Sequence, residues 1–117
     1  MKISIITATF NSAATVRDTI ESVLSQTYQD WELIIVDGLS QDNTLSILRE
    51  YEPLCNGRMH IFSEKDEGFY DAMNRGIAHA TGDVIGILNS DDFYYDEYVL
   101  EDINRAMEDQ PVDCIYS

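Results

Sequence analysis

The sequence predicts an α/β fold in which a mostly parallel sheet carries helices on both faces. Short apolar runs rich in β-branched residues alternate with segments of helical periodicity along the 117 residues. This alternation is typical of parallel strands joined by crossover helices. With 44% hydrophobic and 25% charged residues and no low-complexity tract, the composition is that of one compact domain over residues 1–117.

The first half of the chain contains three expected strands and two expected helices. Residues 3–7, 31–36 and 59–62 are short apolar runs, as in strands that are buried on both faces of a sheet. Apolar residues recur at helical spacing over residues 16–24 and 45–51, and polar residues that favour helix starts precede each segment.

The second half of the chain continues the alternation. Residues 70–80 carry an apolar stripe at helical spacing, and Gly82 stands where glycine commonly follows the end of a helix. Residues 84–88 are a fourth apolar run, and residues 99–107 have the spacing of a last helix. Residues 114–116 are apolar enough to begin a fifth strand.

Three polar clusters follow the expected strands. They cover residues 7–11, 37–42 and 89–92. Ligands of open parallel sheets bind outside the carboxyl ends of the strands. The three clusters are therefore expected to meet at one edge of the sheet and to form the ligand site there.

Asp91 and Asp92 carry the strongest chemical signal. Adjacent carboxylates repel each other unless a cation or hydrogen-bond donors compensate their charge. A small number of hard oxygen ligands suits Mg²⁺ or Mn²⁺ that is also bound by phosphate oxygens and water. The alternative is that one carboxylate caps the next turn while the other is solvated. The position at the end of a buried strand favours the metal.

Asp37 ends an apolar run, so its carboxylate is expected at the ligand edge. There it can accept hydrogen bonds from a base N–H or a ribose hydroxyl. The alternative, a turn residue before Gly38, is about as consistent with the local sequence. The chain has neither the Gly-x-Gly-x-x-Gly nor the Gly-x-x-x-x-Gly-Lys pattern, which disfavours a dehydrogenase-type dinucleotide site and a P-loop.

The charge balance limits the class of partner. Seven Lys and Arg against 22 Asp and Glu give a net charge of −15. This charge argues against nucleic acid or an anionic membrane surface as the main partner, and a phosphate-containing ligand would need a divalent cation. Two distant cysteines, no signal-peptide pattern and no long apolar run favour a cytoplasmic protein.

Ordered motifs along the whole chain carry a resemblance to a known family. They are IITATFN at 5–11, SVLSQT at 22–27, WELIIVDG at 31–38, SQDNT at 40–44, and NRGIAHATGD at 74–83 leading into NSDD at 89–92. In this order they resemble the N-terminal half of family 2 glycosyltransferases. The stretch DEGFYDAMN at 66–74 is similar to a branch found among bacterial O-antigen and capsule transferases.

The resemblance implies a truncated GT-A fold that binds a nucleotide diphosphate sugar with Mn²⁺ or Mg²⁺. It implies transfer of the glycosyl group, with inversion, to a saccharide or lipid-linked saccharide acceptor in cell-surface polysaccharide synthesis. UDP is the expected nucleotide, with GDP and dTDP open. Peripheral association of the full enzyme with the inner face of a membrane and formation of a homodimer also stay open.

The resemblance assigns nucleotide and metal residues by position. The residues that border or bind the nucleotide are Ala8, Thr9, Phe10, Asp37, Asp66 and Asp91. Phe10 packs on the base, Asp37 accepts a hydrogen bond from it, and Asp66 lies near the nucleotide or the sugar. Asp91 binds the metal that bridges the diphosphate, with Asp92 assisting.

Three departures from the family pattern matter. Ala8 stands where many members have Pro or Thr, and Asn89 replaces the first Asp of the Asp-x-Asp motif. Family members carry the acceptor-binding half and the general base after this motif, so the base is expected beyond Ser117. The fragment is therefore expected to bind donor and to transfer sugar poorly or not at all.

Two other interpretations of the function stay open. One is a non-catalytic nucleotide-binding or scaffold module of the same fold. The other is an acidic receiver-type signalling domain, which would carry its acidic pair after the first strand, where this chain has Thr7, Ala8 and Thr9.

Overall fold

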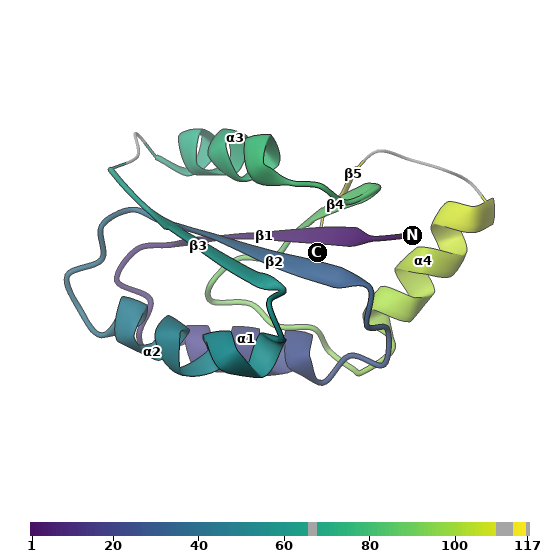
Figure 1. Ribbon diagram of the computed structural model, residues 1–117, viewed down its shortest axis with the longest axis horizontal. Helices are drawn as coiled ribbons and strands as arrows, with labels where there is room; N and C mark the ends of the chain where they lie inside the picture. The colour runs from purple at the N-terminus through teal and green to yellow at the C-terminus, as the bar shows by residue number, and fades with distance from the viewer. Residues whose placement is uncertain (66–67, 110–113, 117) are drawn as a thin grey trace.

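The computed structural model describes residues 1–65, 68–109 and 114–116 and has an α/β fold (Figure 1). The strands are β1 (Ile3–Thr9), β2 (Trp31–Asp37), β3 (Met59–Ser63), β4 (Val84–Ile87) and β5 (Cys114–Tyr116). The helices are α1 (Val16–Leu24), α2 (Thr44–Tyr51), the 3-10 helix η1 (Glu52–Cys55), α3 (Phe69–His79) and α4 (Val99–Asp109). The expected fold class is confirmed.

The five strands form one sheet in the order β3-β2-β1-β4-β5, and every neighbouring pair is parallel. The register aligns Thr9 at the end of β1 with Asp37 at the end of β2, and Asp37 with Ser63 at the end of β3. Three polar side chains from three strands therefore lie in one row at the carboxyl edge of the sheet.

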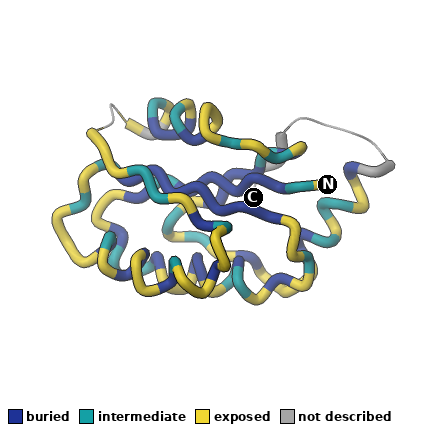
Figure 2. The backbone as a smooth tube through the Cα atoms, viewed as in Figure 1, coloured by how far each residue is buried: buried dark blue, intermediate teal, exposed yellow. Residues whose placement is uncertain are grey.

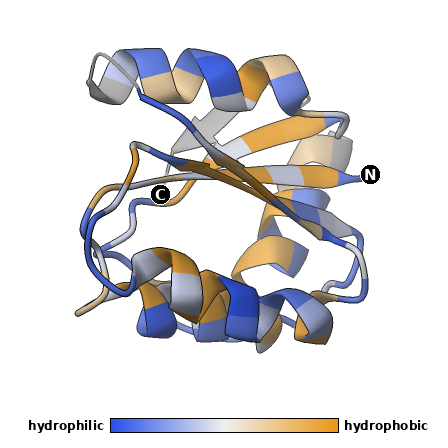
Figure 3. Ribbon diagram, turned by 60° about the vertical axis from the view of Figure 1, so that its left-hand side comes forward, coloured by the Kyte–Doolittle hydropathy of each residue, from blue (hydrophilic) through white to orange (hydrophobic). Residues whose placement is uncertain are grey.

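The helices cover both faces of the sheet, with α3 on one face and α1 and α2 on the other (Figure 1). The strands between these layers are the most buried part of the chain (Figure 2) and among the most hydrophobic (Figure 3). Alternate side chains of each strand lie on opposite faces of the sheet. Ile5 packs in the larger core with α1, α2 and α4, and Ile6 packs in the smaller core under α3. None of the described helices has the length and apolar character needed to cross a lipid bilayer.

Two glycines allow close packing around β1. A Cβ at Gly76 of α3 would lie 2.4 Å from Cγ2 of Ile6, so the helix approaches the sheet where it has no side chain. A Cβ at Gly82 would lie 2.5 Å from Oγ of Ser4 and 2.8 Å from the Lys2 carbonyl oxygen. Gly82 follows the end of α3, as expected, but it does not adopt the left-handed backbone that glycine often has there. Because Gly82 has no side chain, its backbone can lie close to Lys2 and Ser4 at the start of β1.

A buried carboxylate, Glu32, lies on the α3 face of the sheet. Its side chain accepts hydrogen bonds from the Ser4 hydroxyl at 2.5 Å and from the backbone N–H of Thr81 at 2.7 Å. The Lys2 ammonium lies 3.5 Å from the same carboxylate. Burial acts to raise the pKa of Glu32, but the bonds from Ser4 and Thr81 and the charge of Lys2 outweigh it and hold this pKa below its ordinary value.

Candidate functional site

An open cleft lies at the carboxyl ends of β1 and β4. Its larger part has a volume of about 540 Å³ and is lined by Ala8, Asn11, Ser12, Ala14, Thr15, Asn89, Ser90 and Asp91. A second part of about 350 Å³ is lined by Ala8, Thr9, Phe10, Ser12, Gly68, Ala72 and Ser90. Because Ala8, Ser12 and Ser90 line both parts, we treat them as one cleft. It lies at the sheet edge where parallel α/β proteins bind ligands.

Asp37 lies beside this cleft but is fully buried. Its Oδ1 accepts hydrogen bonds from the hydroxyls of Thr9 at 2.7 Å and Ser40 at 2.5 Å. Its Oδ2 accepts from the backbone N–H of Ser40 at 2.8 Å and the hydroxyl of Ser63 at 3.1 Å. The two oxygens of a carboxylate offer about four lone-pair sites. All of them are used by donors from β1, β3 and the loop after β2.

The loops after β1 and β2 are bonded to each other. Asn11 donates its backbone N–H to the Ser40 hydroxyl at 2.9 Å and accepts from the Gln41 N–H at 2.8 Å through its side chain. Asn11 has a left-handed backbone with φ of 49°, a conformation that asparagine tolerates better than most residues. One wall of the cleft is thus held in a defined shape.

Asp42 extends this wall toward α2. Hydrogen bonds from the Thr44 hydroxyl and backbone N–H lower the pKa of the Asp42 carboxyl, the hydroxyl having the larger effect. Asp42 also accepts from the backbone N–H of Ala13 at 3.2 Å, and Thr44 accepts from the N–H of Ser12 at 2.8 Å. The loop that carries Ser12 is therefore anchored to the start of α2.

The polar residues after β4 form a turn that faces the cleft. The backbone N–H of Asp92 donates to the Asn89 carbonyl at 3.0 Å. The hydroxyls of Ser90 and Ser12 lie 2.9 Å apart. Asp91 is exposed and lines the cleft. Asp92 is turned differently, because its Oδ1 accepts from the N–H of Phe93 at 2.9 Å.

The sequence-predicted residues are therefore only partly gathered in the cleft. Those that line it are Ala8, Thr9, Phe10 and Asp91. Asp37 lies beneath Thr9, and Asp92 lines a separate cavity of about 450 Å³ with Phe93, Tyr94, Tyr95 and Val99. Asp66 lies outside the described residues.

The cleft fits a cation that is bound together with a phosphate ligand. Over residues 1–65, 68–109 and 114–116, no group of three or more His, Cys, Asp or Glu side chains is arranged to hold a metal. Mg²⁺ in nucleotide sites is usually held by one or two carboxylates, with phosphate oxygens and water completing its shell. Asp91, with the neighbouring oxygens of Asn89 and Ser90, provides such a donor set. The same residues do not fit a cation held by protein ligands alone.

Sequence reasoning did not single out Ser12 and Thr15. Ser12 contacts Ser90 through its hydroxyl, and Thr15 Oγ1 donates to the Ser90 carbonyl at 2.7 Å. Both residues line the cleft. The sequence identifies Ser12 only as a residue that favours a helix start, and the contacts of Ser12 and Thr15 with a turn far along the chain have no local sequence signal.

Comparisons with known proteins identify the family and the fold. The model of "Glycosyl transferase family 2" matches residues 4–117. A PGL/p-HBAD biosynthesis glycosyltransferase of Mycobacterium tuberculosis is 40% identical over 114 residues, which are 97% of this chain and 44% of that protein. The putative teichuronic acid biosynthesis glycosyltransferase TuaG of Bacillus subtilis is 35% identical over 107 residues, 91% of this chain and 42% of TuaG. The chain spans less than half the length of these relatives.

Solved structures show the same fold. Staphylococcus aureus TarS 1-349 in complex with UDP-GlcNAc superposes with a TM-score of 0.85 at 25% identity, over 93% of this chain and 32% of that one. A mannosyltransferase of Pyrobaculum calidifontis in complex with GDP-Man and Mn²⁺ gives a TM-score of 0.86 at 23% identity, over 95% of this chain and 33% of that one.

Proposed function

The chain belongs to glycosyltransferase family 2, and we propose that it forms the donor-binding part of an enzyme that transfers a sugar from a nucleotide diphosphate. The observation that carries this proposal is the open cleft at the carboxyl ends of β1 and β4, with the exposed Asp91 in its wall. The donor is a UDP-sugar, and the acceptor is a saccharide or lipid-linked saccharide in cell-surface polysaccharide synthesis. The transfer inverts the anomeric centre, and the enzyme works in the cytoplasm.

The nucleoside occupies the part of the cleft that Thr9 and Phe10 line. The Phe10 side chain is 61% exposed, and an exposed aromatic ring offers a stacking face to a base. A base N–H reaches Asp37 only in place of one of the donors that Asp37 already has. The base N–H replaces the Ser40 hydroxyl, because Ser40 keeps a second hydrogen bond to Asp37 through its backbone N–H.

The diphosphate occupies the part of the cleft beside Asp91. The described residues that line the cleft include no Lys or Arg, so these residues offer no side-chain cation to the phosphates. Asp91 would hold Mn²⁺ or Mg²⁺ here, and Asp92 would assist after a change of its side-chain conformation. When bound, the metal neutralises the charge that develops on the leaving diphosphate. The mannosyltransferase solved with GDP-Man and Mn²⁺ supports this proposal by its similar fold.

A non-catalytic nucleotide-binding module is the second candidate. It is favoured by Asn89, which stands in place of the first carboxylate of the Asp-x-Asp motif and leaves the turn with one fewer negative charge. The two candidates share the cleft and differ in whether the full-length protein transfers sugar from the donor it binds.

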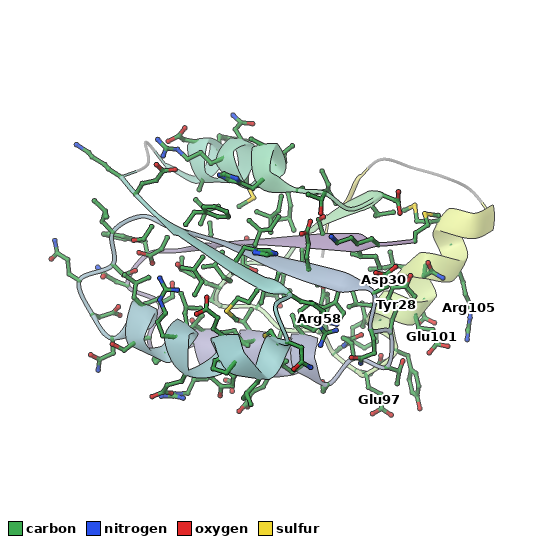
Figure 4. The ribbon with its side chains drawn as sticks, viewed as in Figure 1. Tyr28, Asp30, Arg58, Glu97, Glu101 and Arg105 are labelled. Carbon is green, nitrogen blue, oxygen red and sulfur yellow. The ribbon has the colours of Figure 1, made fainter. Side chains whose placement is uncertain are left out.

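Calorimetric titration of UDP, GDP and dTDP, each with Mn²⁺ and with EDTA, tests the donor site. We expect UDP to bind with Mn²⁺ and Asp91→Ala to remove the metal-dependent part of the affinity. Asp30→Ala is the matched control, because Asp30 is an exposed carboxylate before β2, at the opposite end of the strand from the cleft (Figure 4). Equal binding with Mn²⁺ and with EDTA, or equal loss in both variants, would contradict the proposed site.

A further inference from the structure

The segment that follows the Asn89–Asp92 turn runs alongside α1 and is bonded to it at regular intervals. Thr15 donates to the Ser90 carbonyl at 2.7 Å, and the hydroxyl of Thr19 lies within hydrogen-bond distance of the Asp92 carbonyl. Further along, Ser22 accepts from the Tyr94 N–H at 3.1 Å. Gln26 donates to the Asp96 carbonyl at 2.6 Å and accepts from the Leu100 N–H at 3.0 Å.

The spacing of the bonded residues is regular both on the helix side and along the segment. We call the four helix-side residues the polar stripe: Thr15, Thr19, Ser22 and Gln26. They are spaced by four, three and four residues, which places them on one side of a helix. Their partners fall at every second residue from 90 to 96. Successive turns of the helix, each with a rise of about 5.4 Å, therefore meet alternate residues of the segment.

The polar stripe is largely buried. Thr19 and Gln26 are each 1% exposed. Buried polar side chains are costly unless their hydrogen bonds are made, so the pairing specifies one register of the segment against the helix. The far end of the segment is fixed in the same way. The backbone N–H of Thr27 donates to the Glu97 carbonyl at 2.8 Å, and the Thr27 hydroxyl donates to the Glu101 carboxylate at 2.9 Å. Glu97 and Glu101 lie where α4 begins (Figure 4).

The first two contacts fix the residues on either side of Asp91. The Ser90 carbonyl accepts from Thr15 at 2.7 Å, and the Thr19 hydroxyl, which lies 3.0 Å from the same carbonyl, is closer to the Asp92 carbonyl. The carbonyl groups of the residues before and after Asp91 are thus bonded to Thr15 and Thr19, while the Asp91 carboxylate stays exposed in the cleft. A carboxylate held in this way loses less conformational freedom when a ligand binds it.

We propose that Thr19 is a positioning residue that holds Asp91 in its metal-binding orientation through the Asp92 carbonyl. This inference rests on the proposed function, because it takes Asp91 as the ligand of a metal–diphosphate. It also gives a role to the motif at residues 22–27, of which Ser22 and Gln26 continue the polar stripe. In a merely structural role, the stripe would stabilise the fold without affecting the metal selectively.

The test compares Thr19→Val, which removes the hydroxyl at nearly constant shape, with Thr19→Ser, which keeps it. Thr7→Val is the matched control, because Thr7 is equally buried and its hydroxyl has no hydrogen-bond partner among the residues that the structure describes. UDP is titrated into each variant with Mn²⁺ and with EDTA. Amide hydrogen exchange of Asp92 and Tyr94 is followed without nucleotide, and thermal unfolding verifies that each variant is folded.

We expect Thr19→Val to weaken Mn²⁺-dependent UDP binding about threefold to tenfold, the equivalent of one hydrogen bond, and to leave binding in EDTA unchanged. Exchange at Asp92 and Tyr94 should be faster in this variant, whereas Thr19→Ser and Thr7→Val should behave as the unchanged protein. If Thr19→Val does not fold, Thr15→Val makes the same comparison through the Ser90 carbonyl.

Two results would overturn the positioning role of Thr19. One is unchanged Mn²⁺-dependent affinity in folded Thr19→Val, and the other is an equal loss with Mn²⁺ and with EDTA. Failure of the proposed function is recognised separately, because the unchanged protein would then already show no Mn²⁺-dependent binding of UDP. That result would also remove the basis of this inference.

Discussion

The buried Asp37 carboxylate provides a quantitative test of how the cleft wall is held together. Its two oxygens accept from three hydroxyls and one backbone N–H. In Asp37→Asn, one of these oxygens becomes an NH₂ group. Placed at Oδ2, this group meets the Ser40 N–H, and two donors then face each other. Placed at Oδ1, it faces the hydroxyls of Thr9 and Ser40, which must turn to accept.

The expected cost follows from these bonds. A hydrogen bond to a charged group contributes about 1.5–3 kcal/mol and a neutral one about 0.5–1.5 kcal/mol, so each weakened bond loses about 1 kcal/mol. All four bonds lose their charged acceptor, which removes about 4 kcal/mol in total. A neutral side chain is less costly to bury, which offsets part of this loss, so we expect a net loss of about 2 kcal/mol in the free energy of unfolding.

Urea unfolding at neutral pH measures this loss directly, because a shift of the midpoint at constant slope reports stability alone. Asp30→Asn makes the same chemical change at an exposed position and should alter stability by less than about 0.5 kcal/mol. If Asp37→Asn were as stable as the unchanged protein, the hydrogen bonds of Asp37 would not be what stabilises the cleft wall.

Three further predictions follow from the structure. Glu32 has a pKa below its ordinary value of 4.5 in the folded protein. Its contribution to stability is therefore present above that pH and is lost as the pH falls through the lower folded pKa. Glu32→Gln should accordingly flatten the fall in melting temperature over this acid range. Gly82→Ala should cost about 3 kcal/mol in urea unfolding, since its Cβ meets backbone atoms, and Gly76→Ala about 1 kcal/mol, since it meets a side chain and gains helix propensity. Phe10→Ala should weaken UDP binding about tenfold in calorimetry, the equivalent of one stacked base, without lowering stability, because this side chain is 61% exposed.

The fold and the place of the cleft were predictable because they depend on local patterns. Apolar runs such as residues 31–36 specify strands, and their alternation with helices specifies a parallel sheet. That sheet brings residues 8–10 and Asp91 to one edge. The fold and the position of the cleft can therefore be predicted without knowing which side chains are in contact.

Other features depend on contacts between distant residues. Thr19 interrupts the apolar pattern of α1 and Gln26 follows the end of this helix, and the partners of both lie about 70 residues further along the chain. Gly82 has the local sequence of a helix-ending glycine, but its position is determined by the proximity of β1. The four hydrogen bonds of Asp37 come from separate strands and loops. The sequence therefore identifies the carboxylate but cannot show that all of its acceptor sites are occupied.

Locating Mn²⁺ by its anomalous scattering in crystals grown with UDP tests the metal–diphosphate site most directly. We expect one peak between the diphosphate and the carboxylate of Asp91, and no peak with Asp91→Ala under the same conditions. A nucleotide bound away from the cleft, or a metal bound to the diphosphate with no contact to the Asn89–Asp92 turn, would contradict the assignment of Asp91.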